Sequence, residues 1–288
     1  MAVILTRPPS ALVGADPAHF DPDVAHALAE LAQIAYRPAG TARVESDAVG
    51  WPGCQSLQVG AGQLAVLWAP EAIVVSVRGS DQGADWPSNL RGIWRRGWSR
   101  LPPGCRVGMG WLGQAKAMLP EVARLLIFAL SRHPTAPIFW VGHSAGGPIA
   151  TVLCAALEVP APRLVVTFSA PRGWNRRGAA WYDATYPQTW GVVPVIRGAP
   201  DAATRVPPKW SGAHHVGRRI MLVEGRALEN LEDWRALEDS HPVGWLPSWR
   251  ILSRVVAGIG IHPIGVTVGV LRRMAEAEDV TEREEIDR

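Results

Sequence analysis

Short apolar runs alternate along this chain with segments in which apolar residues recur every three or four positions. The short runs have the length and composition of buried strands, and they cover residues 64–68, 72–77, 138–142, 164–168, 192–196 and 220–223. The segments with helical spacing cover residues 22–35, 115–130, 149–157 and 226–237. Strands that alternate with helices in this way predict an α/β fold, with a mostly parallel central sheet and helices on both of its faces.

The same pattern divides the chain into three parts. Residues 1–19 are expected to form a loose leader, and residues 20–250 form one domain, which is long enough to bury a full core. In the last part, residues 251–288, a run without formal charge (255–271) precedes a charged tail. A membrane-spanning helix needs about 20 apolar residues, and this shorter run is interrupted by Pro263. We expect it to pack on the domain, with membrane contact as the alternative.

Residues 137–148 combine a strand, a G-x-S-x-G motif and the start of a helix. The apolar run ends in Gly142-His143-Ser144-Ala145-Gly146, and residues with helical character follow at once. This is the setting of a nucleophile elbow, in which a sharp turn presents a serine at the tip of a strand. Glycines on either side of the serine remove Cβ atoms that would clash in such a turn. The motif therefore predicts Ser144 as a nucleophile at a helix N-terminus, where N–H groups stabilise an oxyanion.

A serine nucleophile requires a histidine base and a carboxylate that orients the histidine. In proteins with this elbow the chain order is serine, acid, histidine, and the acid and the base follow late strands. Asp201 directly follows the predicted strand 192–196, and His241 stands beyond the last predicted strand. We therefore predict that Ser144, Asp201 and His241 form a catalytic triad.

Other histidines and carboxylates fit these two roles less well. They are His143, His214, His215, His262, Asp183 and Asp239. His214 and His215 precede the last predicted strand and are expected at the wrong edge of the sheet. His143 lies inside the elbow with its side chain directed away from Ser144, and Asp183 falls on a predicted helix.

Two positions are predicted to donate N–H groups to the oxyanion. One donor comes from the residue after the nucleophile, here Ala145, and the other from the loop after a neighbouring strand. The strand at 72–77 leads into Arg78-Gly79-Ser80. Ser80 offers both a backbone N–H and a hydroxyl group. A plain strand-to-loop turn is the alternative interpretation of Ser80.

Tryptophan and arginine alternate in residues 82–104, and glycines interrupt the segment. This composition predicts a lid over the site whose Trp86, Trp94 and Trp98 contact substrate or lipid. Trp94 and Trp98 are four residues apart, as are two arginines, so a helix would place them in an apolar and a cationic stripe. Ordinary solvated surface is the alternative.

Composition narrows the function classes. A hydrophobic fraction of 48% with 19% charged residues excludes wholesale disorder. The net charge is only +3, and no five like charges are consecutive, so nucleic-acid binding is not predicted. Tryptophan dominates the aromatic residues, with 14 Trp against 3 Tyr and 4 Phe, which suits contact with lipid interfaces.

The cysteines and the N-terminus bear on cofactors and location. Cys54, Cys105 and Cys154 have no metal-binding spacing, and neither a metal nor a cofactor is predicted. Cys54 and Cys105 either pair or remain buried thiols. The first residues lack a basic region and a sufficiently long apolar stretch for a signal peptide. This predicts a cytoplasmic protein, with secretion by a signal-independent route as the alternative; the oligomeric state is not predicted.

Seven stretches of the chain match, in order, the motifs of one known family. They are Val74 to Ser80 with Asp85-Trp86, Val107 to Trp111, Gly142 to Gly147, Thr167 to Arg172, Asp201 with Arg205 to Pro208, His215 to Gly217, and Asp239 to His241. Together they resemble the class 3 lipases, the filamentous-fungal type of triacylglycerol lipase in the α/β-hydrolase superfamily. The chain departs from the family's pattern in three places: Ala145 replaces Leu, Gly108 replaces His, and Ser169 replaces Gly.

The resemblance implies an α/β-hydrolase fold and a cofactor-free lipase or carboxylesterase that acts through an acyl-serine intermediate. It implies Ser144 as nucleophile, Asp201 as acid, His241 as base, Ser80 and Ala145 as oxyanion donors, and a structural role for His215. It also implies a lid after Ser80. Two alternatives remain open: a phospholipase A1, exported as an effector, and a lipid-binding or signalling protein that keeps the fold without turnover.

Overall fold

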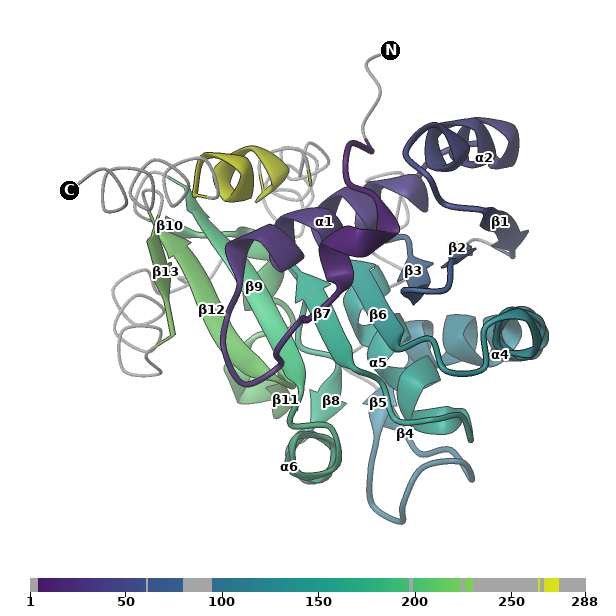
Figure 1. The fold of residues 1–288 in the computed structure, drawn as a ribbon. Coiled ribbons are helices and arrows are strands. Elements are labelled where there is room, and N and C mark those ends of the chain that lie inside the picture. The colour runs from purple at the N-terminus through teal and green to yellow at the C-terminus, as the bar shows by residue number, and fades with distance from the viewer. Residues whose placement is uncertain are drawn as a thin grey trace.

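The computed structural model describes residues 5–60, 62–79, 95–196, 199–223, 226–229, 264 and 267–274. Within these residues a large mixed sheet forms the centre of the molecule (Figure 1). Its strands, in spatial order, are β1 (Gly53–Val59), β2 (Gly62–Trp68), β3 (Ile73–Val77), β6 (Ile138–His143), β7 (Leu164–Phe168), β9 (Thr189–Ile196), β12 (Arg218–Val223) and β13 (Arg226–Leu228). A short strand, β10 (Ala199–Pro200), pairs with β9.

The middle of the sheet is parallel. β3, β6, β7, β9 and β12 run in the same direction, whereas β1, β2 and β13 pair antiparallel at the two edges. The carboxyl ends of the five parallel strands therefore meet at one edge of the sheet, where ligand sites of such sheets lie. The sequence-based prediction of a mostly parallel α/β fold is confirmed.

Two apolar cores lie on opposite faces of the sheet because successive residues of a strand point to opposite sides. In β6, Phe139 and Val141 belong to one core, while Ile138 and Trp140 belong to the other. The first core is covered by α1 (Pro22–Ile34), and the second by α4 (Met109–Arg132) and α5 (Gly146–Ala156). Figure 1 shows α1 above the sheet and α4 and α5 below it.

The stretch expected to be a loose leader is packed over its described part. Leu5 and Leu12 are buried in the core beneath α1, and Leu12 is the last residue of a 3-10 turn, η1 (Pro9–Leu12). Glu30 of α1 accepts hydrogen bonds from the backbone N–H and the hydroxyl of Thr6, both at 2.7 Å. The expectation of a loose leader is therefore wrong from residue 5 onward, because two leucines and a buried carboxylate hold the segment.

Residues near the C-terminus join the same core. Ile264, Val268, Leu271 and Met274 pack into the core beneath α1, and Figure 1 shows this helical segment beside α1. No helix among the residues that the structure describes is long and apolar enough to cross a membrane.

A second, four-stranded sheet lies beside α5 and α6 (Arg176–Thr185). Its strands, in order, are β11 (Ala213–His214), β8 (Trp174–Asn175), β5 (Val107–Gly108) and β4 (Arg95–Arg96). Since residues 95–96 are extended, the helical stripes expected for the tryptophans and arginines of the lid are wrong at Arg95 and Trp98. Two 3-10 turns, η3 (Ala202–Arg205) and η4 (Lys209–Ser211), lie on the connection from β10 of the main sheet to β11 of this one.

Three local predictions had other outcomes. A helix, α2 (Ala39–Ala48), follows the segment 22–35, at residues for which the sequence pattern predicted no helix. Residues 226–228 form β13, although helical spacing was read from Arg226 onward. Cys54, Cys105 and Cys154 are all buried free thiols, so the pairing of Cys54 with Cys105 does not occur.

Candidate active site

Ser144 lies at the turn between β6 and α5 in a strained backbone conformation. Its φ is +53°, a left-handed value that non-glycine residues adopt rarely and at a cost of about 1–2 kcal/mol. The turn is fixed by two backbone hydrogen bonds: the Ser144 N–H donates to the Phe168 carbonyl, and the Gly147 N–H donates to the Ser144 carbonyl, both at 2.9 Å. Ser144 is therefore held as a nucleophile elbow holds its serine.

Three glycines make this turn sterically possible. A Cβ on Gly142 would be 2.8 Å from the Gly147 Cα, and a Cβ on Gly146 would be 2.8 Å from the Arg78 carbonyl carbon. A Cβ on Gly79 would be 2.7 Å from the His143 carbonyl oxygen and 2.9 Å from the Ser144 Cβ. The end of β3 and the start of α5 thus approach the elbow so closely that only hydrogen fits at these positions.

Asp201 lies at the same edge of the sheet as Ser144. It directly follows β10, which pairs with β9, and β9 is separated from β6 only by β7. The Asp201 side chain is 7% exposed, and its Oδ1 accepts a hydrogen bond from the Ala203 N–H at 2.9 Å, which caps η3. Its own N–H donates to the Pro194 carbonyl at 3.2 Å. The carboxylate is therefore buried and oriented by the backbone around it.

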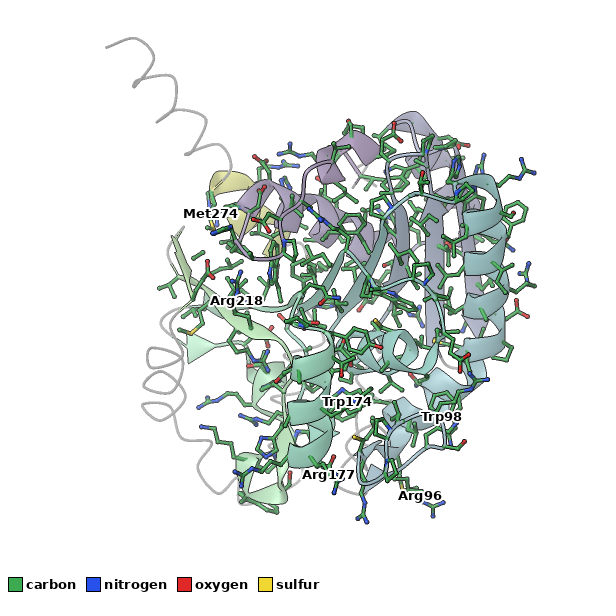
Figure 2. The ribbon with its side chains drawn as sticks, turned by 60° about the horizontal axis from the view of Figure 1, so that its bottom comes forward. Arg96, Trp98, Trp174, Arg177, Arg218 and Met274 are labelled. Atoms are coloured by element: carbon green, nitrogen blue, oxygen red, sulfur yellow. The ribbon has the colours of Figure 1, made fainter. Side chains whose placement is uncertain are left out.

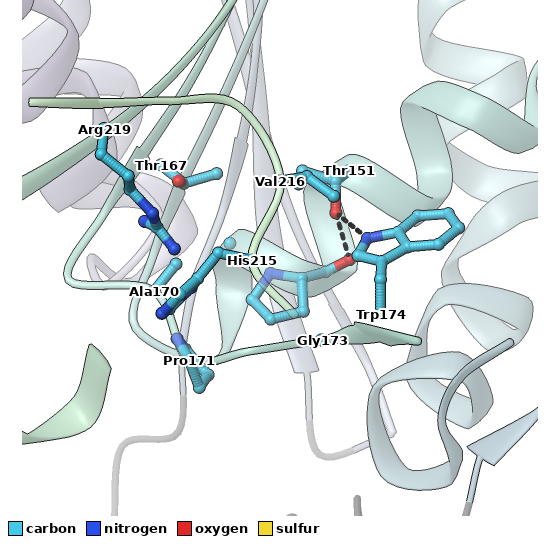
Figure 3. Close-up of a pocket in the computed structure, with 11 residues that line it drawn as sticks. Thr151, Thr167, Ala170, Pro171, Gly173, Trp174, His215, Val216 and Arg219 are labelled. Carbon is cyan, nitrogen blue, oxygen red and sulfur yellow. Dashed lines mark hydrogen bonds between the residues drawn. The ribbon is translucent and has the colours of Figure 1, made fainter. Parts of the chain in front are cut away.

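The segment after Asp201 has little regular structure and is fixed by two side chains from other elements. The buried guanidinium of Arg172 donates hydrogen bonds to the carbonyls of Arg205 and Pro207, the latter at 2.8 Å. His215 Nε2 donates to the Thr204 carbonyl at 2.8 Å. Figure 3 shows His215 beside Ala170 and Pro171 in a pocket that lies behind the elbow. These contacts explain why His215 has the place that the resemblance assigns to a structural histidine.

Tyr36 joins the elbow to the end of β3. Its hydroxyl accepts a hydrogen bond from the Gly79 N–H at 3.0 Å and lies 2.8 Å from His143 Nδ1. Because the hydroxyl accepts from Gly79, its own proton is available for Nδ1. One side chain therefore connects the residue before Ser144 with the residue before Ser80. Nothing in the local sequence around Tyr36 indicates this role, since it depends on a contact across 107 residues.

A second strained residue follows the neighbouring strand. Ser169, after β7, has a φ of +50° and is 1% exposed. Its N–H donates to the Val192 carbonyl at 3.0 Å. This is the position where the resemblance noted Ser in place of the family's Gly. The left-handed conformation explains the family's preference, because glycine adopts it without a steric penalty.

The remaining predicted site residues divide into two groups. Ala145 is buried at the N-terminus of α5, where the first backbone N–H groups of a helix lack intrahelical acceptors. Trp98 is half-buried against the core beside α4, with the Lys116 ammonium 5.5 Å from its ring centroid. The other predictions, His241, Ser80, Trp86 and Trp94, lie outside the described residues.

Other titratable groups near the site do not compete for these roles. Burial raises the pKa of the Cys154 thiol to about 12, so this cysteine remains a neutral thiol at physiological pH. Burial also raises the pKa of Asp183, partly offset by a hydrogen bond from the Gly217 N–H at 2.7 Å. Within the described part of the chain no three His, Cys, Asp or Glu residues are grouped as metal ligands.

Comparisons with known proteins agree with this arrangement. Residues 74–210 match the family described as lipase (class 3). A secreted mono- and diacylglycerol lipase of Fusarium solani is 30% identical over 158 residues, which are 54% of this chain and 46% of that protein. A Saccharomyces cerevisiae protein named as a lipase is 25% identical over 45% of this chain and 44% of its own length. The chain thus spans less than half the length of these curated relatives.

Solved structures that are similar to this chain support the assignment of its fold. A lipase from Rhizopus microsporus var. chinensis superposes with a TM-score of 0.56 at 19% identity, over 70% of this chain and 73% of that one. The residues matched by the family include β3, the elbow, Arg172 and Asp201. We conclude that the chain has the α/β-hydrolase fold and that its residues 74–210 carry the class 3 lipase pattern.

Proposed function

We propose that this protein is a serine hydrolase that cleaves carboxylic esters of lipids. The observation that carries the proposal is the φ of +53° at Ser144, between a parallel strand and a helix, at the sheet edge that also holds Asp201. Strain of this kind is stored at functional sites. The class 3 lipase match over residues 74–210 supports an ester as the substrate.

In the proposed mechanism Ser144 Oγ attacks the ester carbonyl while His241 removes its proton. His241 then delivers the proton to the leaving alcohol, and Asp201 holds the imidazole in the required tautomer. The N–H groups of Ala145 and Ser80 stabilise the oxyanion of each tetrahedral intermediate. Water completes the cycle by the same steps and releases the acid.

The buried position of Asp201 fits its role in this mechanism. A carboxylate in a site of low dielectric interacts strongly with an imidazolium. The capping hydrogen bond from the Ala203 N–H fixes one of its oxygens. Tyr36 has a supporting role on the oxyanion side of the site, because its hydroxyl joins Gly79, the residue before Ser80, to His143 of the elbow.

The direct test is labelling with a fluorophosphonate and hydrolysis of acyl esters, triglycerides and phospholipids. Ser144→Ala should abolish labelling and lower kcat by about 10⁴–10⁶, as in other serine hydrolases. His241→Ala should lower activity comparably, whereas His215→Ala should mainly lower stability, because His215 contacts the Thr204 carbonyl. A protein that is not labelled and hydrolyses no ester would instead be a binding protein on this fold.

A further inference from the structure

The small sheet gathers basic residues from three distant parts of the chain. Segments 95–120, 169–182 and 202–223, which supply its strands together with parts of α4 and α6 and the strand β12, contain twelve Lys and Arg, and the acidic residues Glu121, Asp183, Asp201 and Glu224 stand at their bounds. The whole chain has 29 basic and 26 acidic residues, so this imbalance is local. We call the five exposed basic residues next to these strands the basic strip: Arg96, Arg106, Arg176, Arg177 and Lys209.

Hydrogen bonds hold the parts of the basic strip together. The Asn175 side chain accepts from the backbone N–H groups of Arg106 and Gly178 and donates to the Gly104 carbonyl. It therefore ties the loop before β5 to the start of α6, which carries Arg176 and Arg177. The stem of Arg177 passes over Gly104, which has no side chain to displace it. Figure 2 shows Arg96 and Arg177 at the same lower edge of the molecule.

Within the described part of the chain, Arg96, Arg106, Arg176 and Arg177 form no ion pair. Other arginines do form ion pairs: Arg124 of α4 contacts Glu121 of the same helix at 2.9 Å. These four arginines of the basic strip, gathered at the surface without ion-pair partners among the described residues, raise the local positive potential and attract an anionic partner. The structure therefore indicates a surface for binding and not merely a solvated face.

A tryptophan at the end of the basic strip defines the kind of partner. Trp210, in η4, is 82% exposed, although an indole favours sites that are apolar on one side and wet on the other. Its neighbour is Lys209, so the turn presents an indole and an ammonium group together. Tryptophan beside basic residues is the combination that anchors proteins at lipid headgroups. A nucleic-acid duplex would use the charges, but its bases are already paired and stacked and offer no apolar layer to receive the exposed indole.

We propose that the basic strip and Trp210 form a docking surface for a membrane rich in anionic phospholipids. Arg96 is shared with the segment predicted as a lid, residues 82–104, whereas the other four basic residues and Trp210 lie outside that segment. The proposal rests on the proposed function only in that a lipid-ester hydrolase has reason to bind a lipid surface. The docking surface and the acid belong to one stretch of chain: Trp210 follows Asp201 by nine residues, and Arg172 and His215 fix residues that lie between them. The enzyme would thus be oriented on the membrane with the Asp201 side of its candidate site facing the lipid surface.

The test is sedimentation with vesicles of phosphatidylcholine that contain phosphatidylglycerol, and with vesicles of phosphatidylcholine alone. The variant is Arg176→Gln with Arg177→Gln, and the matched control is Arg124→Gln with Arg273→Gln, which removes the same charge from other exposed positions. Each basic residue near an anionic surface contributes about 1 kcal/mol, so the variant should bind the anionic vesicles about 10–30-fold more weakly. The control should bind like the parent protein, and added salt should weaken the parent's binding.

Trp210→Ser should weaken binding without changing its dependence on salt. Hydrolysis of a short soluble ester, measured on the same preparations, should be unchanged in all variants. Equal losses in variant and control, equal binding to both vesicle types, or preferential binding to a DNA duplex would each overturn the proposal. Intact vesicle binding by a protein that hydrolyses no ester would overturn the proposed function and leave the docking surface standing.

Discussion

The elbow and the acid segment are two regions that meet at one edge of the sheet but are held by different forces. The elbow, residues 142–147, is fixed by steric exclusion: glycines allow β3, β6 and α5 to approach until no Cβ fits between them. The acid segment, residues 201–208, has few regular hydrogen bonds of its own and is held by the side chains of Arg172 and His215. Close backbone approach is the main constraint on the first region, in addition to its backbone hydrogen bonds and the contact of His143 with Tyr36. Hydrogen bonds from two distant side chains are the main constraint on the second.

The difference predicts how each region responds to damage. A steric fit fails abruptly, because backbone atoms cannot move aside without disturbing two strands and a helix. A segment held by hydrogen bonds relaxes by smaller steps, because the lost bonds are partly replaced by water. We therefore expect changes in the elbow to threaten the fold, and changes around the acid segment to affect catalysis in a protein that still folds.

The largest effect is expected at Gly146. A Cβ there would press on the backbone of Val77 and Arg78, so Gly146→Ala should lower the free energy of unfolding by about 3–5 kcal/mol, in the range of the most damaging core changes. Urea unfolding measures this. Gly113→Ala is the control, since a Cβ at that position in α4 meets nothing within 4 Å. The Gly113→Ala variant should have the same free energy of unfolding as the parent protein, or one that is higher by about 0.5–1 kcal/mol. Similar results for both glycines would mean that steric exclusion does not hold the elbow.

An intermediate effect is expected at Arg172. Arg172→Met leaves the carbonyls of Arg205 and Pro207 without this donor, so stability should fall by about 1–3 kcal/mol. In addition, kcat should fall by about 10–100-fold, because a displacement of Asp201 by about 1 Å suffices for that. Arg163→Met is the matched control. Its guanidinium also donates to a backbone carbonyl, that of Ala15, but far from the acid segment, so kcat should not change. A stable Arg172→Met protein with full kcat would show that Arg172 does not position Asp201.

The smallest effect, and the only gain, is expected at Ser169. This residue lies between the two regions with a φ of +50°, and Ser169→Gly should raise the free energy of unfolding by about 0.5–1 kcal/mol by removing the left-handed strain. Thermal unfolding measures the gain. Ser169→Ala, which keeps a Cβ, should not be stabilised. If alanine stabilised as much as glycine, loss of the hydroxyl and not relief of strain would be the cause.

Much of the fold follows from local pattern. The strand at 164–168 has the bounds of β7, and the hairpin around Pro70-Glu71 joins β2 to β3. Such segments are buried on both sides, so their apolar runs are unambiguous. The pattern was misleading at 226–228, which pair with β12 as a strand although their spacing is also helical. Short segments of this kind take their structure from the neighbour with which they pair.

The candidate site, like the fold, has some features that follow from local sequence and others that depend on tertiary contacts. The sequence determined that a serine stands between a strand and a helix, because the glycine requirements of an elbow are local and leave a motif. It also predicts a triad in the order Ser144, Asp201 and His241, and because His241 lies outside the described residues the triad remains a prediction. Only the tertiary structure decided that Tyr36 joins His143 to Gly79, that Arg172 holds the acid segment, and that Asn175 ties the loop of Arg106 to the start of α6. These features depend on contacts between residues 33 to 107 positions apart, and no local pattern encodes which distant groups folding brings together.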